Sequence, residues 1–128
     1  MFESLDFVYV PTGDVDASVT GYVEQLGASL EWKVRAMGTV VACLRVSADG
    51  PRVLLADHLA GDVPVLIYRV ASYRDAVDSL RAAGVDLREV EIPSGPCATF
   101  VAEGGQHYGV YELTRPGAAD SFRGRVDD

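Results

Sequence analysis

The sequence predicts an α+β fold of two tandem βαβββ units, with curled mixed sheets around a central cavity and the helices outside. Two observations support it. The order strand, helix, strand, strand, strand occurs twice in 128 residues, and each helix opens at a capping residue and ends at a glycine. A chain of this length fits one domain, residues 1–128. The units span about 5–58 and 64–114, followed by a C-terminal tail, 115–128.

The first unit begins with LDFVYV (5–10), an apolar run typical of a strand. Residues 14–27 follow as a helix that Asp14 or Asp16 can cap and that Gly27 can end. LEWKVRAM, TVVACLRVS and PRVLLAD then predict three strands, the last two joined by a hairpin at 48–50.

The second unit repeats this order. PVLIYRV (64–70) predicts a strand, and residues 72–84 a helix from Ser72 to Gly84. LREVEI, CATFVAE and HYGVYELT predict three more strands, with a turn at 104–105 between the last two. We match Phe7 with Val65 and Leu54 with Glu112, because both pairs are 58 residues apart (65 − 7 and 112 − 54).

Composition narrows the function classes. A net charge of −8 repels phosphate backbones, so we expect no nucleic-acid partner. No stretch resembles a signal peptide or a membrane span, so we expect a cytoplasmic protein without a membrane partner. Cys43 and Cys97 lie in apolar surroundings without CxxC spacing, which favours reduced core thiols.

The two units resemble those of the vicinal oxygen chelate superfamily, which includes glyoxalase I, extradiol dioxygenases, fosfomycin resistance enzymes and bleomycin-binding proteins. LDFVYVPTGDVDAS is similar to the family's opening strand and helix start, YRVASYRDAVDSLRAAGVDL to its second strand–helix pair, and GVYELTRP to its closing strand. The resemblance covers about residues 5–116.

The resemblance implies metal ligands on the first and fourth strands of each unit. Those places hold Phe7, Leu54, Val65 and Glu112, and three of the four side chains cannot coordinate a cation. We therefore expect no cofactor. A divalent metal would need a displaced ligand set, for which His58, with Asp57, and His107 are the candidates.

Alternation along the strands predicts an interior face, on the assumption that Glu112 points inward. With Trp32 added from an early strand, the candidate ligand-binding residues are Phe7, Tyr9, Trp32, Arg52, Leu54, Val65, Ile67, Arg69, Tyr108, Val110 and Glu112. The opposite face, suited to packing under the helices, would hold Val8, Val10, Val53, Leu55, Leu66, Tyr68, Val70, Tyr111 and Leu113.

Several roles stay open at this level. Glu112 can contact a ligand, act as a general acid or base, or pair with Arg52 or Arg69. The segment IPSGPCATF (92–100) is either a rim of the cavity or an ordinary connection, and Trp32 can line the pocket or a subunit contact.

Three function classes follow. The first is a metal-free small-molecule-binding protein of the bleomycin-resistance type, holding an organic, cationic or aromatic ligand in the cup; this is the prediction we adopt. The alternative is a metal-dependent lyase, isomerase or dioxygenase with a displaced ligand set. The third is an interaction module. A homodimer is expected in each case, because an isologous dimer is the commonest assembly.

Overall fold

The computed structural model describes residues 1–59 and 61–128. The first unit comprises β1 (Phe2–Pro11), α1 (Val15–Leu26), β2 (Ser29–Ala36), β3 (Thr39–Arg45) and β4 (Arg52–Ala56). Helix α1 begins where the Asp14 carboxylate accepts a hydrogen bond from the Ala17 amide at 3.0 Å. It ends at Gly27, whose φ of 70° lies in the left-handed region that glycine tolerates.

The second unit comprises β5 (Val65–Val70), α2 (Tyr73–Ala82), β6 (Arg88–Ile92), β7 (Gly95–Val101) and β8 (His107–Tyr111). Ser72 caps α2 by accepting a hydrogen bond from the Asp75 amide at 3.2 Å. A short 3₁₀ helix, η1 (Ala118–Asp120), lies in the C-terminal segment, residues 115–128. The predicted fold class is confirmed.

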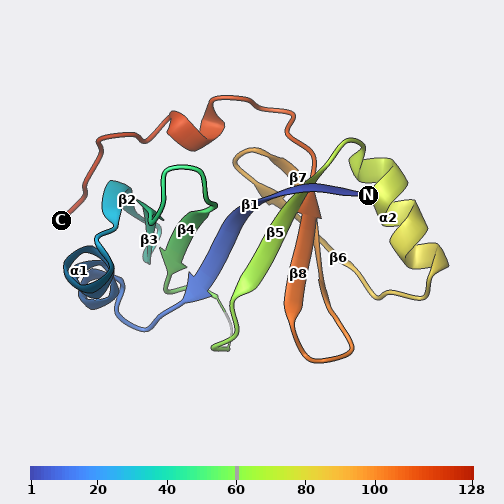
Figure 1. The fold of residues 1–128 in the computed structure, drawn as a ribbon, viewed down its shortest axis with the longest axis horizontal. Helices are drawn as coiled ribbons and strands as arrows, with labels where there is room; N and C mark the ends of the chain where they lie inside the picture. Colours follow the sequence, from blue (N-terminus) through green and yellow to red (C-terminus); the bar gives the residue numbers. More distant parts are fainter. Residues whose placement is uncertain (60) are drawn as a thin grey trace.

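The strands form one eight-stranded sheet in the order β2-β3-β4-β1-β5-β8-β7-β6. The units meet at the antiparallel pair β1–β5, and within each unit the first and fourth strands are parallel. The sheet arches, with α1 and α2 outside its two ends (Figure 1). No helix among the described residues is long and apolar enough to span a membrane.

Three apolar clusters define the faces of the sheet. The interior cluster contains Phe7, Trp32, Cys43, Leu54, Ile67, Cys97 and Tyr111. A second cluster lies under α1 and includes Val15, Leu44 and Leu55, and a third lies under α2 and includes Val70, Val77 and Val110. Both faces of the sheet are therefore largely apolar, as expected for a sheet covered on both sides.

The C-terminal segment leaves β8 and crosses to the other end of the sheet, ending near α1 (Figure 1). There it runs along β2: the Lys33 amide donates to the Arg125 carbonyl at 2.8 Å, and the Asp127 amide donates to the Lys33 carbonyl at 2.9 Å. Lys33 and Val126 form a parallel bridge. The segment thus covers the free edge of β2.

Candidate functional site

The structure changes the register predicted for the two units. Phe7 pairs with Arg52 on β4, and its counterpart Val65 pairs with His107 on β8. The fourth strands are therefore related by 55 residues (107 − 52), and not by 58. A shift by an odd number of residues turns every side chain of a strand to the other face. His107, Gly109 and Tyr111 consequently share the interior face of β8 with Val65 and Ile67 on β5.

The prediction that Glu112 points into the cup is wrong. Glu112 follows β8, and its Oε1 accepts a hydrogen bond from the backbone amide of Tyr73 at 2.8 Å, at the first residue of α2. A carboxylate there is held by a free amide and by the positive end of the helix dipole. Glu112 therefore stabilises the start of α2.

Three other side chains on β8 are also corrected. Val110 is fully buried under α2, and Tyr108 stacks on Phe100 with ring centroids 5.8 Å apart, so neither lies on the interior face. Tyr111, predicted to pack under a helix, belongs instead to the interior cluster. Its hydroxyl donates a hydrogen bond to Asp6, and burial together with that carboxylate raises its pKa.

The predicted pairing of Glu112 with an arginine is wrong as well. The Nε of Arg69 lies 3.2 Å from the Asp6 carboxylate. Arg52 Nε lies 3.2 Å from Glu31, and its Nη2 lies 2.8 Å from Asp120 in the C-terminal segment. Each arginine thus has its own acidic partner.

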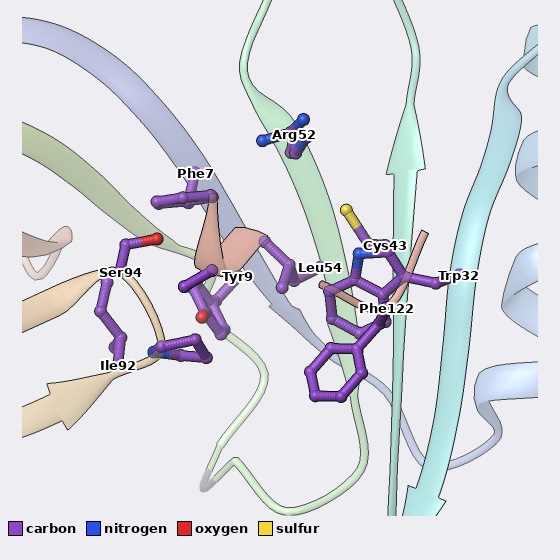
Figure 2. A pocket seen from close by; sticks show the side chains of 11 residues that line it. Phe7, Tyr9, Trp32, Cys43, Arg52, Leu54, Ile92, Ser94 and Phe122 are labelled. Atoms are coloured by element: carbon purple, nitrogen blue, oxygen red, sulfur yellow. The ribbon is translucent and has the colours of Figure 1, made fainter. Parts of the chain in front are cut away.

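A small cavity of about 30 Å³ lies on the interior side of the first unit, enough for one or two water molecules (Figure 2). Five predicted residues line it: Phe7, Tyr9, Trp32, Arg52 and Leu54. Ile92, Pro93 and Ser94 form another wall, so this part of the 92–100 segment is a rim. Ala118 and Phe122 of the C-terminal segment also line the cavity.

A much larger groove of about 1210 Å³ lies on the interior side of the second unit. The predicted residues Tyr9, Val65 and Ile67 line it. His58 and His107 line it too, although the sequence prediction placed them only in a displaced metal site. His107 lies five residues before Glu112, so the assumption that Glu112 points inward turned His107 away from the predicted pocket.

Tyr9, His107 and His58 are among the polar residues that line the groove. Tyr9 pairs with Val65, and Val65 pairs with His107, so these three residues form a row across β1, β5 and β8. Two interstrand spacings separate the backbones of Tyr9 and His107, about 10 Å. His58 lies just past the end of β4, beside the end of β1. A phenol and an imidazole thus line the same groove, on either side of Val65 in this row.

Protonation states limit the chemistry. Burial raises the pKa of Tyr9 above its ordinary value, so its hydroxyl keeps its proton and can donate a hydrogen bond. Burial also raises the pKa of the Cys97 thiol to about 12. Because the thiolate is the nucleophilic form, Cys97 is not a nucleophile near neutral pH.

The side chains do not fit a divalent metal ion. Phe7, Leu54 and Val65 lie on the interior face and carry no donor atom, and Glu112 points elsewhere. Within residues 1–59 and 61–128, no group of three or more His, Cys, Asp or Glu side chains converges as a metal site would require. We therefore assign no chemical step to a metal ion.

The fold has close counterparts among solved structures. The methylmalonyl-CoA epimerase of Mycobacterium tuberculosis aligns with a TM-score of 0.74 and 21% identity, over 92% of this chain and 93% of that chain. A variant of the Streptomyces coelicolor methylmalonyl-CoA epimerase, in complex with 2-nitronate-propionyl-CoA, aligns with a TM-score of 0.71 and 14% identity, over 90% of this chain and 100% of that chain. The chain has the vicinal oxygen chelate fold.

A further vicinal oxygen chelate structure, a methylmalonyl-CoA epimerase in complex with methylmalonyl-CoA and NH4+, has a TM-score of 0.70 and 14% identity over 96% of this chain and 99% of that chain. No family model and no curated protein sequence matches the chain. These neighbours are epimerases, two of them in complex with CoA thioesters, which overturns the prediction of a metal-free binder of the bleomycin-resistance type and favours the enzyme alternative.

Proposed function

We propose that the protein is an isomerase that moves a proton at the carbon next to a carbonyl group, acting on an acyl thioester or a carbonyl compound of similar size. The observation that carries this proposal is the row of Tyr9, Val65 and His107 inside a groove of about 1210 Å³, with His58 at the same end. The epimerases of the same fold, bound to CoA thioesters, support the reaction class.

Imidazole is the side chain most often used for proton transfer near neutral pH. In the proposed reaction, His107 takes the proton from the α-carbon, and the electron pair moves to the carbonyl oxygen. The Tyr9 hydroxyl donates a hydrogen bond to that oxygen. His58 donates a proton to the opposite face of the carbon, and proton exchange with solvent then returns His107 and His58 to their starting states. No electrons are gained or lost, so no redox cofactor is needed.

The test measures hydrogen–deuterium exchange at the α-carbon. A panel of 2-substituted acyl-CoA and acyl-pantetheine thioesters is incubated with the protein in D₂O and followed by NMR. We expect exchange with at least one member, lost by more than tenfold in His107→Asn and unchanged in Arg74→Ala, whose side chain is exposed on α2.

The panel is run after chelation and again with added Co²⁺, Mn²⁺, Ni²⁺ or Zn²⁺. Exchange that appears only with a stoichiometrically bound metal would restore the metal-dependent alternative. No exchange under any of these conditions would refute the proposal.

A further inference from the structure

The interior sides of the two units differ in what fills them. In the second unit the interior is an open groove of about 1210 Å³. In the first unit the interior cavity measures only about 30 Å³, and Ala118 and Phe122 of the C-terminal segment form part of its wall. The same chain thus contains one open cup and one occupied by its own C-terminal segment.

The contacts of the C-terminal segment are those of a bound ligand. The Phe122 ring meets Trp32 at a centroid distance of 5.3 Å and an interplanar angle of 60° (Figure 2). The Asp120 carboxylate lies 2.8 Å from Arg52 Nη2, whose side chain is only 18% exposed. The Phe122 ring therefore packs against Trp32, and the Asp120 carboxylate, two residues earlier, pairs with the largely buried Arg52.

The attachment of the segment suits reversible docking. Gly117 and Gly124 have φ values of 89° and 81°, so both ends of the docked stretch turn at glycines. Between them, Ser121 and Arg123 are exposed, and Phe122 is half-buried. Beyond Gly124, exposed hydrogen bonds hold the segment on the edge of β2, both between backbones and from Arg35 to Asp127 and Asp128. Few buried contacts and exposed hydrogen bonds mark a segment that opens at low free-energy cost.

We propose that the interior of the first unit is a second binding site, for a small molecule that carries a carboxylate and a planar apolar group. Asp120 and Phe122 occupy this site as an internal ligand. Arg52 holds the carboxylate, Trp32 and Leu54 hold the apolar group, and an incoming ligand displaces the C-terminal segment. Because Tyr9 and Ile92 line both spaces, displacement joins the small cavity to the groove of the second unit.

The probe for this site is 3-phenylpropionate, which has one carboxylate and one ring. Trp32 is the only tryptophan, so its fluorescence reports on the site directly. We compare the wild-type chain with the Asp120→Asn/Phe122→Ala double variant by fluorescence and calorimetry. We expect the double variant to bind the probe at least tenfold more tightly, because the site is no longer occupied. Ser121→Ala is the matched control, since Ser121 is exposed and its Oγ donates a hydrogen bond to the Ala118 carbonyl within the segment.

Two further measurements keep the test decisive. Adding Arg52→Gln to the double variant must abolish probe binding. In the wild-type chain, saturating probe must speed hydrogen exchange at the Lys33 and Asp127 amides, which bond across the segment and β2. A folded double variant that fails to bind the probe, or binding that leaves exchange at both amides unchanged, would overturn the proposal.

Discussion

The carboxylate of Glu112 accepts a hydrogen bond from the backbone amide of Tyr73 at 2.8 Å, across the gap between the end of β8 and the start of α2. Because of this contact, Glu112, which the sequence predicted to bind a ligand, instead caps helix α2 and does not line the groove. The contact predicts that Glu112→Ala lowers stability by about 1 kcal/mol, because a helix N-terminal amide loses its acceptor. Chemical denaturation measures the loss.

Glu112→Gln is the control variant, because the glutamine side-chain oxygen can still accept the hydrogen bond from the Tyr73 amide. We expect it to lose less than Glu112→Ala. If either substitution abolished ligand binding while leaving stability unchanged, Glu112 would belong to the site after all.

A close backbone approach at Gly95 gives a second prediction. A Cβ at Gly95 would lie 2.0 Å from the Glu112 carbonyl oxygen, with φ at +157°. Backbone atoms must move to make room, so we expect Gly95→Ala to destabilise the fold by about 3 kcal/mol. Calorimetric melting measures this. The control is Gly104→Ala, because a Cβ there meets nothing within 4 Å, and it should change stability by less than about 0.5 kcal/mol.

The two thiols give a third prediction. Burial raises the pKa of both Cys43 and Cys97 from 9.0 to about 12. The unfolded chain releases these protons at lower pH than the folded chain, so stability falls as pH rises from about 9 toward 12. In the native protein at pH 8, neither thiol should react rapidly with a disulfide reagent, whereas both should react in urea. Rapid labelling of one native thiol would contradict this assignment.

Acid should release the C-terminal segment. The ion pair with Arg125, and then the Arg35 amide, hold the pKa of Asp127 at about 2, below its ordinary value of 3.8. Arg125 belongs to the same segment, so the part of the shift that depends on docking comes chiefly from the Arg35 amide; that contribution is present above pH ~4 and disappears as the pH falls toward 2. We expect Trp32 fluorescence to change over this range, with Asp127→Ala already altered at neutral pH. An identical acid transition in wild type and variant would exclude Asp127 as its cause.

Ionic strength distinguishes two kinds of substrate. The net charge of −8 repels the phosphates of a CoA thioester, and salt screens this repulsion. If a CoA thioester is the substrate, KM should fall severalfold between low and moderate salt. The uncharged pantetheine thioester should show no such change. A KM for the CoA thioester that rises with salt would indicate a local basic site that overrides the net charge.

The sequence predicted the elements well because their signals are local. Asp14, Ser72 and Gly27 act through caps and turns within a few residues, and alternation marked the strands. The face of β8 could not be obtained this way. It depends on pairing between strands far apart in the chain, and a register difference of three residues moved Glu112, Tyr108 and Val110 off the interior.

The groove histidines and the docked C-terminal segment were missed for related reasons. The assumption that Glu112 points inward placed His107, five residues earlier, on the opposite face, so His107 was left out of the pocket. The segment from Pro116 onward has no periodicity, so its placement follows from particular long-range contacts, such as Phe122 with Trp32 and Asp120 with Arg52. Such contacts leave no pattern in a single sequence.

The margins of the sheet limit how copies of this protein can associate through their backbones. The edge strand β2 is already hydrogen-bonded to Arg125 and Asp127 of the same chain. The edge strand on the other side of the sheet is β6. While the C-terminal segment stays docked on β2, strand-to-strand addition cannot proceed head to tail. Two molecules joined β6 to β6 would leave no further margin open, so growth by this route stops at a pair.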